Sequence, residues 1–496
     1  MIGLVTGAVA IGVSELVAGI FVPGASPVIA VGQAAIDLSP EWMKSFAIRT
    51  FGEDDKLALL IGIGAVLAVV AAVLGVWSLR RPAAGIAGLV GLGLLGGTAA
   101  LTRPGSVWGD AAPAIAGVVA GVPVLRLLRA QATGTRAPAR VSAQERRRFL
   151  LTAAGGVAFA AAGGGLGAWL TRRTGADDSR AGVRIPEPAS EAVTGADTDL
   201  GVAGVSSFVT PNDRFYRVDT ALLVPSVMAE EWRLRLHGMV DRELTLDYRQ
   251  LLDRPMIERD ITLACVSNPV GGRYVGNARW IGTPVPELLR EVGVQPGADQ
   301  IVTRSADGWT CGTPTSVVMD GRDAMLAVAM NGEPLPLSHG FPVRMVVPGL
   351  YGYVSATKWL VDMELTTFDA FDAYWIERGW AERAPVKTMS RIDTPTGRTP
   401  VAAGEVPIGG VAWAQHVGIE GVEVQIDDGP WLPAELGGVD SLDTWRQWVL
   451  RWDSAPGDYR LRVRATDRAG TTQLEERVEP FPDGAEGWHT VYVRVE

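Results

Sequence analysis

Residues 262–272 read Thr-Leu-Ala-Cys-Val-Ser-Asn-Pro-Val-Gly-Gly and place Cys265 between an apolar run and a glycine-rich loop. The run predicts a strand that ends at the cysteine, and the glycines allow the backbone to approach a large ligand closely. A thiolate is a soft metal ligand, and nearby positive charge keeps it deprotonated. The alternatives are a buried apolar cysteine and, outside the cytoplasm, a disulfide with Cys311.

The composition of the whole chain excludes several classes of site and partner. The 496 residues include 2 Cys and 4 His, which excludes a disulfide-rich scaffold and any zinc or iron–sulfur site with four cysteine ligands. The net charge of −10 argues against nucleic acid as the main partner. The mean hydropathy of +0.17 is high for a water-soluble chain, and the apolar residues are concentrated before Thr171.

This N-terminal part, residues 1–170, is predicted to be an α-helical transmembrane bundle. A helix crosses the hydrocarbon core with about 20 apolar residues. The stretches that meet this length are residues 2–22, 57–79, 83–101, 111–128 and 149–170. Residues 26–38 are apolar but too short to cross, so we expect them to lie in the interface or to re-enter. Glu15, inside the first span, is either a functional carboxylate or a bundle-facing or interfacial one.

Arginines set the expected orientation of the bundle. Arg80 and Arg81 lie between the second and third spans. The others lie at or between the fourth and fifth spans: Arg126, Arg129, Arg136, Arg140, Arg146, Arg147 and Arg148. Because positively charged loops stay in the cytoplasm, we expect a multi-pass protein of the cell membrane, in contact with membrane lipid, with everything after Leu170 outside the cytoplasm.

The fifth span carries a second signal. Arg146, Arg147 and Arg148, followed by a Gly/Ala-rich apolar stretch to residue 170, resemble a twin-arginine export signal. The alternative is flanking charge of the kind that any membrane protein has. Residues 171–200 are polar and are predicted to form a linker.

The rest of the chain is predicted to form two globular domains. Residues 201–396 mix short strands (232–240, around 245, and 341–348) with an amphipathic helix at 285–292, which indicates an α+β domain. Apolar residues alternate in short runs after Ile408, so residues 397–496 are predicted to form a β-sandwich. Gly349 and Gly352, followed by Thr357 and Lys358, suit an anionic group, although such a loop alone is a weak signal.

Together these stretches identify a resemblance. From about Val205 onward, the chain resembles the sulfite oxidase family of molybdopterin-dependent oxidoreductases, in its membrane-anchored actinobacterial branch. The motifs that carry the resemblance are Cys265-x-x-Asn268, Ala278-Arg279-Trp280-x-Gly282, residues 330–344 and residues 347–359. Residues 421–424 and Trp445-x-x-Trp448 resemble the family's immunoglobulin-like dimerisation domain, which is compatible with a homodimer formed through this domain.

The resemblance implies a cofactor and a set of residues that bind it. It implies that the Cys265 thiolate coordinates molybdenum beside the dithiolene of a single pyranopterin and oxo groups. The implied cofactor contacts are Asn212, Tyr216, Arg217, Asn268, Thr315, His339, Arg344, Thr357 and Lys358. For His339, Arg344 and Lys358 the alternative is a structural turn or a surface ion pair. The other histidines, at 237, 416 and 489, are expected to be structural or superficial.

Departures from the family pattern bear on the substrate. Val270 and Val328 stand where sulfite oxidases have an arginine and a tyrosine. The Arg-Asn-His triplet of sulfite oxidases is matched at Arg217 alone, with Val218 and Asp219 following. Two anchors for a compact dianion are therefore missing, which disfavours sulfite as the substrate.

The sequence thus predicts a membrane-anchored, outward-facing molybdenum oxidoreductase that performs two-electron oxo transfer on a small or oxidised sulfur or nitrogen compound. Cys265 would hold the metal, and Arg217 would orient the small-molecule substrate. The alternatives are a sulfite dehydrogenase and a cofactor-free, membrane-anchored binding protein with Cys265 and Cys311 paired. The spans contain no histidine, so electrons are expected to pass to or from a separate redox partner or a quinol.

Overall fold

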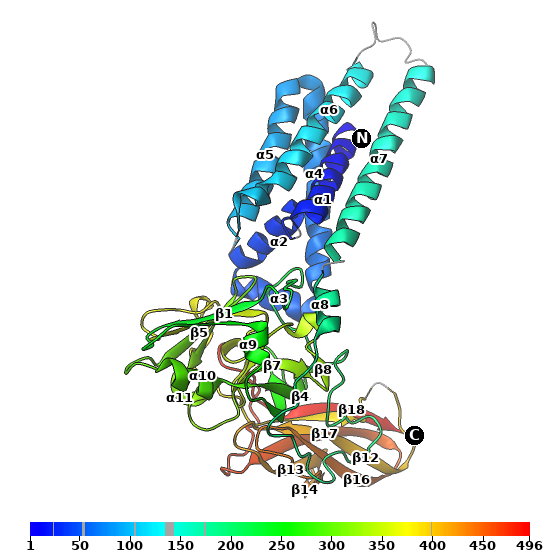
Figure 1. The fold of residues 1–496 in the computed structure, drawn as a ribbon. Coiled ribbons are helices and arrows are strands. Elements are labelled where there is room, and N and C mark those ends of the chain that lie inside the picture. The colour runs from blue at the N-terminus through cyan, green and yellow to red at the C-terminus, as the bar shows by residue number, and fades with distance from the viewer. Residues whose placement is uncertain (23, 52–54, 104–105, 134–142, 173–174, 398) are drawn as a thin grey trace. The chain divides into compact units, whose positions relative to one another are not determined.

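The computed structural model describes the 496-residue chain except for residues 23, 52–54, 104–105, 134–142, 173–174 and 398 (Figure 1). The described residues form two compact units. One comprises Met1–Asp177 and Asp219–Ser226, and the other comprises Asp178–Val218 and Val227–Glu496. Arg136 and Arg140, which contributed to the predicted orientation, lie outside the described residues.

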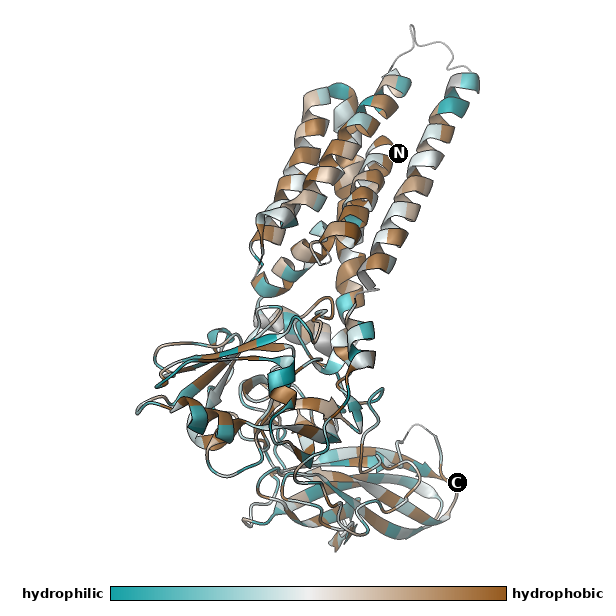
Figure 2. Cartoon of the chain, in the orientation of Figure 1, coloured by the Kyte–Doolittle hydropathy of each residue, from teal (hydrophilic) through white to brown (hydrophobic). Residues whose placement is uncertain are grey.

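The first unit is a helical bundle whose apolar colouring runs along its long helices (Figure 2). Its helices are α1 (Ile2–Phe21), α2 (Pro27–Leu38), α3 (Glu41–Phe51), α4 (Asp55–Arg80), α5 (Pro82–Leu101), η2 (Trp108–Ala111), α6 (Ala112–Thr133) and α7 (Ala143–Arg172). Among the described residues, 5 helices are long and apolar enough to cross a membrane, as the sequence predicted. Helix α2 covers the apolar stretch at 26–38 that is too short to cross a membrane.

Small residues let the helices of the bundle pack closely. A Cβ atom on Gly12 of α1 would lie 2.6 Å from the carbonyl oxygen of Ala160 in α7, so a larger residue would force these helices apart. Glu15 of α1 accepts a hydrogen bond from Ser26 Oγ at 2.5 Å, and Ser26 caps the N-terminus of α2. The bundle-facing alternative for Glu15 therefore agrees with the structure.

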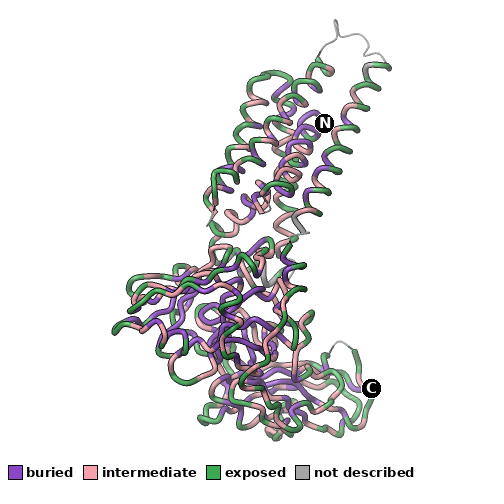
Figure 3. The backbone as a smooth tube through the Cα atoms, viewed as in Figure 1, coloured by how far each residue is buried: buried purple, intermediate pink, exposed green. Residues whose placement is uncertain are grey.

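Two sheets build the α+β domain in the second unit, and buried residues line their strands (Figure 3). The first has the order β2 (Leu244–Asp247), β1 (Arg233–Gly238), β10 (Leu360–Thr366), β5 (Gln300–Ser305), β6 (Thr310–Pro314), with β1 and β10 parallel. The second has the order β3 (Ile257–Ala264), β4 (Val275–Pro284), β7 (Met325–Met330), β8 (Glu333–Pro334), and β9 (Arg344–Val346) pairs with β7.

Short helices connect these strands: α9 (Tyr248–Leu252), α10 (Val285–Val292), α11 (Thr315–Val318), η3 (Leu337–His339), η4 (Gly352–Val354) and η5 (Ile376–Arg378). The structure confirms the strands predicted at 232–240 and near 245 and the helix at 285–292. The strand expected at 341–348 is shorter, because only Arg344–Val346 pairs with β7.

The stretch predicted to be a linker, 171–200, contains helix α8 (Ala176–Gly182). Arg180 of α8 donates hydrogen bonds to the carbonyl oxygens of Pro334 (2.7 Å) and Leu335 (2.9 Å). Ser190 forms a parallel bridge with Ile257 at the start of β3. From Asp178 onward this stretch belongs to the same compact unit as the α+β domain.

The C-terminal strands form two sheets around one core. The orders are β11 (Met389–Thr394), β12 (Gly404–Trp413), β16 (Arg446–Ser454), β15 (Glu435–Leu436), and β14 (Trp431–Pro433), β13 (Ile419–Ile426), β17 (Gly457–Asp467), β18 (His489–Val495). Ile408 and Trp448 of the first sheet share a hydrophobic cluster with Val424 and Leu461 of the second. β11 lies before the boundary predicted after Thr396 and pairs with β12.

Candidate active site

Cys265 lies directly after β3, at the start of a loop that closes on itself. Its amide donates to the Tyr274 carbonyl oxygen at 2.9 Å, and its own carbonyl accepts from the Asn268 amide at 3.1 Å. The Asn268 side-chain oxygen accepts from the Tyr274 amide at 2.8 Å. Gly271 has φ +75°, which favours glycine at this turn. Asn268, predicted to contact the cofactor, therefore shapes the loop that presents Cys265.

Both cysteines are free thiols. Cys265 is partly exposed, whereas Cys311 is fully buried in β6. The disulfide that the sequence left open is therefore wrong for this structure. The alternative of a cofactor-free binding protein, which paired these cysteines, loses its structural basis.

Aromatic contacts bring three predicted cofactor residues together. Tyr216 stacks on Phe215 with ring centroids 5.2 Å apart, and Phe215 meets the His339 ring edge-on at 5.6 Å. Arg344 lies over the Trp280 ring at 4.9 Å and donates a hydrogen bond to the His339 carbonyl oxygen at 3.2 Å. Tyr216, His339 and Arg344 thus form one cluster, although Tyr216 lies more than a hundred positions before the other two.

Glycines let the surrounding loops meet this cluster. A Cβ atom on Gly352 would lie 3.7 Å from the Ala264 carbonyl oxygen and 4.0 Å from the Tyr216 hydroxyl. Gly340, at φ +109°, lies between Lys358 and Arg344, because its Cβ atom would be 3.0 Å from one and 3.1 Å from the other. The end of β3 before Cys265, the residue 216 segment and the glycine-rich loop therefore converge.

Positive charge and burial dominate the electrostatics of this cluster. Burial raises the pKa of the Cys265 thiol, and hydrogen bonds with Ser267 and the nearby Lys358 charge oppose that rise. Burial, together with Lys358 and Arg344, lowers the pKa of His339 to about 4, so this imidazole is neutral at pH 7. Burial lowers the pKa of Arg344 to about 10, which leaves it charged at pH 7.

Several buried polar atoms of the predicted cofactor residues have no hydrogen-bond partner among the described residues. These atoms are His339 Nδ1, Arg344 Nε and Thr315 Oγ1. Buried polar groups in folded proteins are nearly always hydrogen-bonded, and each exception calls for an explanation. The uncommitted Arg344 N–H donor and the nearby Lys358 charge fit a large anionic cofactor such as a pterin phosphate with a thiolate-bound metal. His339 Nδ1 is unprotonated, because Nε2 carries the proton of the neutral ring, and it offers this cofactor an acceptor.

Other predicted residues have different surroundings. The Thr357 hydroxyl is fully buried and lies 2.6 Å from the Thr303 hydroxyl, so it is used in internal packing. Asn212 presents its carbonyl oxygen to His339 Nε2 at 3.1 Å, while its side chain bonds to Asn331 at 2.8 Å. Arg217 is partly exposed, and its charge contributes to lowering the pKa of His339.

Sequence reasoning missed the support that the C-terminal domain gives to the cysteine strand. The Thr262 hydroxyl, three residues before Cys265, accepts from the Trp445 amide at 2.7 Å. The Thr262 carbonyl oxygen accepts from Gln415 Nε2 at 3.1 Å. No local pattern in the sequence indicates these pairs, because they join residues more than a hundred positions apart.

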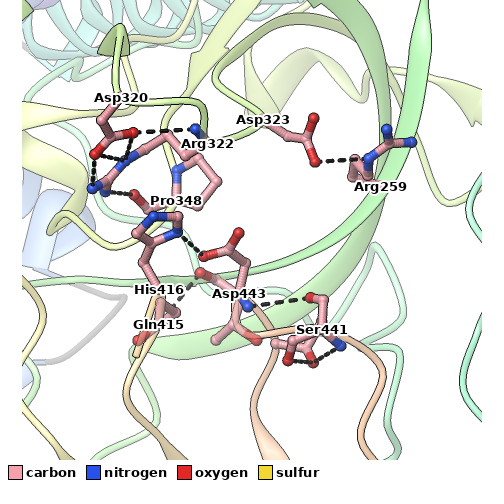
Figure 4. A network of polar contacts seen from close by, with 11 residues as sticks. Arg259, Asp320, Arg322, Asp323, Pro348, Gln415, His416, Ser441 and Asp443 are labelled. Carbon is pink, nitrogen blue, oxygen red and sulfur yellow. Dashed lines mark hydrogen bonds and ion pairs between the residues drawn. The ribbon is translucent and has the colours of Figure 1, made fainter. Parts of the chain in front are cut away.

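Arg322 of the α+β domain and His416 of the C-terminal domain both lie against the glycine-rich loop (Figure 4). Arg322 donates to the Pro348 carbonyl oxygen at 2.5 Å and pairs with Asp320 at 2.6 Å. A Cβ atom on Gly349, at φ +82°, would lie 2.8 Å from Arg322 and 3.0 Å from His416, so this position requires glycine. The His416 ring contacts Asp443 at 3.1 Å and has a structural place, as expected.

The neighbouring strands β1 and β10, in the interior of the first sheet, carry a group of side chains that could hold a metal ion. His237, Asp362 and Glu364 place potential ligand atoms within 4.8 Å of one another. Arg304 pairs with Asp362 at 3.3 Å and with Glu364 at 2.6 Å, so it already balances both carboxylates. This arrangement is an ion-pair network, which agrees with the structural role expected for His237.

Comparison with known proteins is consistent with this site. Residues 221–375 match the family model described as the oxidoreductase molybdopterin binding domain. The uncharacterized oxidoreductase YuiH of Bacillus subtilis is 31% identical over 153 residues, which cover 31% of this chain and 74% of that protein. Human mitochondrial sulfite oxidase is 28% identical over 344 residues, which cover 58% of this chain and 62% of that protein. The chain thus spans about three fifths of the length of the sulfite oxidases it matches.

A solved structure shares the fold. The sulfane dehydrogenase SoxCD from Paracoccus pantotrophus superposes with a TM-score of 0.51 at 23% identity, covering 60% of this chain and 88% of that one. The residues that match the family model include β5 to β7 and the neighbouring strands of this chain. The match to YuiH covers most of the length of that protein. The chain therefore belongs to the sulfite oxidase family of molybdopterin-dependent oxidoreductases.

Proposed function

We propose that this protein is a membrane-anchored, outward-facing enzyme that transfers an oxygen atom to or from a small sulfur or nitrogen compound, with Cys265 as the protein ligand to molybdenum. The observation that carries the proposal is the group of buried polar atoms without partners on His339, Arg344 and Thr315, since Cys265 and the first two belong to converging segments. When bound, the cofactor supplies two-electron redox chemistry and oxygen-atom transfer.

The chain's own residues hold the cofactor and prepare the thiol. The Lys358 charge favours the thiolate form of Cys265 and so favours a metal bond. Arg344 donates to the anionic part of the cofactor through its free Nε. The neutral His339 donates through Nε2 to the Asn212 carbonyl oxygen, which fixes the ring, and its unprotonated Nδ1 is left as an acceptor for a donor of the cofactor. Tyr216 closes the site beside Cys265. Arg217, partly exposed on the same segment, orients a negatively charged or polar substrate.

The proposed location follows from the helices and the arginines. The bundle anchors the chain in the cell membrane, with Arg146, Arg147 and Arg148 exposed at the start of α7 as a twin-arginine-like signal. The catalytic domain would face away from the cytoplasm. Electrons are exchanged with a separate redox protein or a quinol, and the C-terminal sandwich acts as an immunoglobulin-like dimerisation domain.

Within the family a sulfur compound is the favoured substrate class. The names of two similar proteins, sulfite oxidase and sulfane dehydrogenase, both refer to sulfur compounds. Sulfite itself is the second candidate, favoured by the similarity to human sulfite oxidase and opposed by Val270 and Val328. Turnover of sulfite by the purified chain at rates typical of enzymes would favour this candidate over the first.

The test is the molybdenum content of the full-length chain, purified in detergent from a molybdate-supplied host. The wild-type chain is expected to carry stoichiometric molybdenum, and Cys265→Ser to lose most of it. Cys311→Ser is the matched control, because it removes the other thiol, and it should keep its metal. Metal-free wild-type protein, or equal metal in wild type and Cys265→Ser, would overturn the proposal.

A further inference from the structure

Residues Asp219–Ser226 lie in the middle of the catalytic sequence, yet they cluster with the helical bundle and not with the domain on either side of them. We call these residues the docking segment. They begin two positions after Arg217. We propose that the docking segment makes the membrane bundle a positioning element of the active site, which fixes residues 212–217 through the Lys56–Asp219 ion pair.

The docking segment is attached to the bundle by a buried ion pair. Lys56 Nζ at the start of α4 pairs with Asp219 Oδ1, and the Asp219 side chain is 7% exposed. A paired charge at this depth is costly to break, because the remaining partner stays buried without compensation. The pair therefore holds the chain firmly just beyond Arg217.

Two further contacts extend this attachment. The Leu222 amide donates to the Gln33 side chain of α2 at 3.2 Å. The Leu222 side chain packs on Gly32 of the same helix, where a Cβ atom would lie 2.7 Å from Leu222 Cδ2. Ala221 and Leu222 are buried in this contact. Charge, hydrogen bonding and packing thus all attach the docking segment to α2 and α4.

The other end of residues 212–217 is held within the catalytic unit, by the helix that follows the last span. Arg180 of α8 pairs with Glu333 at 2.8 Å, and Glu333 accepts a hydrogen bond from the Asn212 side chain. The segment that carries Tyr216 and Arg217 is consequently held at both ends. One end depends on the bundle, which predicts that a change in the bundle reaches Arg217.

This arrangement also accounts for a departure from the family pattern. Asp219 stands where the sulfite oxidase triplet has its histidine, and its carboxylate pairs with Lys56. An aspartate at position 219 is then explained by its ion pair with the bundle. Lys56 and Asp219 are positioning residues, and Arg217 is the residue they position.

The test is hydrogen–deuterium exchange of the full-length chain in lipid nanodiscs, read by mass spectrometry. Lys56→Met should raise exchange in residues 210–226, including the peptide with Tyr216 and Arg217, by about tenfold, because local opening becomes easier. Lys56→Arg, which keeps the charge, should show exchange close to that of the wild type. The charge-swapped double variant, Lys56→Asp with Asp219→Lys, should do the same.

Lys387→Met is the matched control. Lys387 has the same exposure as Lys56, 22%, and pairs with Asp483 and Glu486. It should raise exchange near residues 479–487 and leave 210–218 unchanged. A Lys56→Met effect that stops at residue 219, or no effect at all, would overturn the proposal. If Lys56→Met raises hydrogen exchange throughout the chain, the double variant Lys56→Asp with Asp219→Lys is the deciding measurement. Exchange in residues 210–218 that stays above the wild-type level in this double variant counts against the proposal.

The inference rests on the proposed function in one respect only, namely that Arg217 orients the substrate during turnover. The exchange measurement needs no substrate and no bound metal. A chain that fails the molybdenum test and passes the exchange test would refute the proposed function and leave the attachment intact.

Discussion

Cys265 and Cys311 are chemically the same residue in two different settings. Cys265 follows a strand, opens a loop and lies among Lys358, His339 and Arg344, whereas Cys311 lies within β6 against the hydroxyl of Thr313 at 3.7 Å. Burial raises the pKa of both thiols, but a cation opposes this rise only at Cys265 among the interactions found for the two. A metal-binding cysteine is therefore recognised by nearby charge and by its place at a loop, not by burial.

The largest contrast should appear in thiol reactivity. In cofactor-free protein, Cys265 is partly exposed and should react with iodoacetamide at least about a hundredfold faster than Cys311, which requires an opening of the domain. Peptide mapping of the alkylated chain measures both rates. Equal rates would mean that the two settings do not differ in access.

The second contrast concerns the neighbours of the two thiols. His339 near Cys265 has a pKa of about 4, lowered by burial and by Lys358, against 6.5 in the unfolded chain. Between these values the unfolded state binds more protons, so stability is full above pH 6.5 and falls as the pH drops toward 4. The loss reaches about 3 kcal/mol over the full window.

His339→Gln should remove this part of the pH dependence. Melting temperatures of cofactor-free protein measured from pH 7 to pH 4 should fall less steeply in the variant than in wild type. His489, whose pKa burial lowers to about 4, leaves a residual slope in both proteins. Parallel curves for the two proteins would contradict the buried, neutral state of His339.

The smallest contrast is the effect of a single cation. Lys358 lowers the pKa of Cys265, so Lys358→Met should shift the pH profile of Cys265 alkylation to higher pH, and Lys358→Arg should shift it less. The profile of Cys311, measured after unfolding, should be the same in all three proteins. A profile of Cys265 that is unchanged in Lys358→Met would remove the electrostatic argument for this thiol.

The sequence predicted those features that depend on local pattern. The long apolar runs gave the helices that can cross a membrane, and the amphipathic stretch at Val285–Val292 gave helix α10. The glycines around Cys265 and Gly349 indicated tight loops, and the structure has positive φ angles at Gly271 and Gly349. The pairing of β11 with β12, across the boundary predicted after Thr396, is a long-range contact that local composition does not reveal.

What the sequence did not predict are pairs between distant residues. Thr262 with Gln415 and Trp445, and Asp219 with Lys56, depend on how separate elements pack, and no spacing along the chain encodes them. The same holds for the roles of Asn268 and Thr357. Asn268 also closes the cysteine loop and Thr357 also packs against Thr303, while the cofactor contacts implied by resemblance stay predictions.

The central claim is that Cys265 binds the metal, and X-ray absorption at the molybdenum edge tests it most directly. The full-length wild-type chain should show a sulfur shell from the cofactor's dithiolene and the thiolate, and any metal retained by Cys265→Ser should show one sulfur neighbour fewer. Cys311→Ser should match the wild type. The same sulfur shell in wild type and Cys265→Ser would contradict the assignment of Cys265 as the ligand.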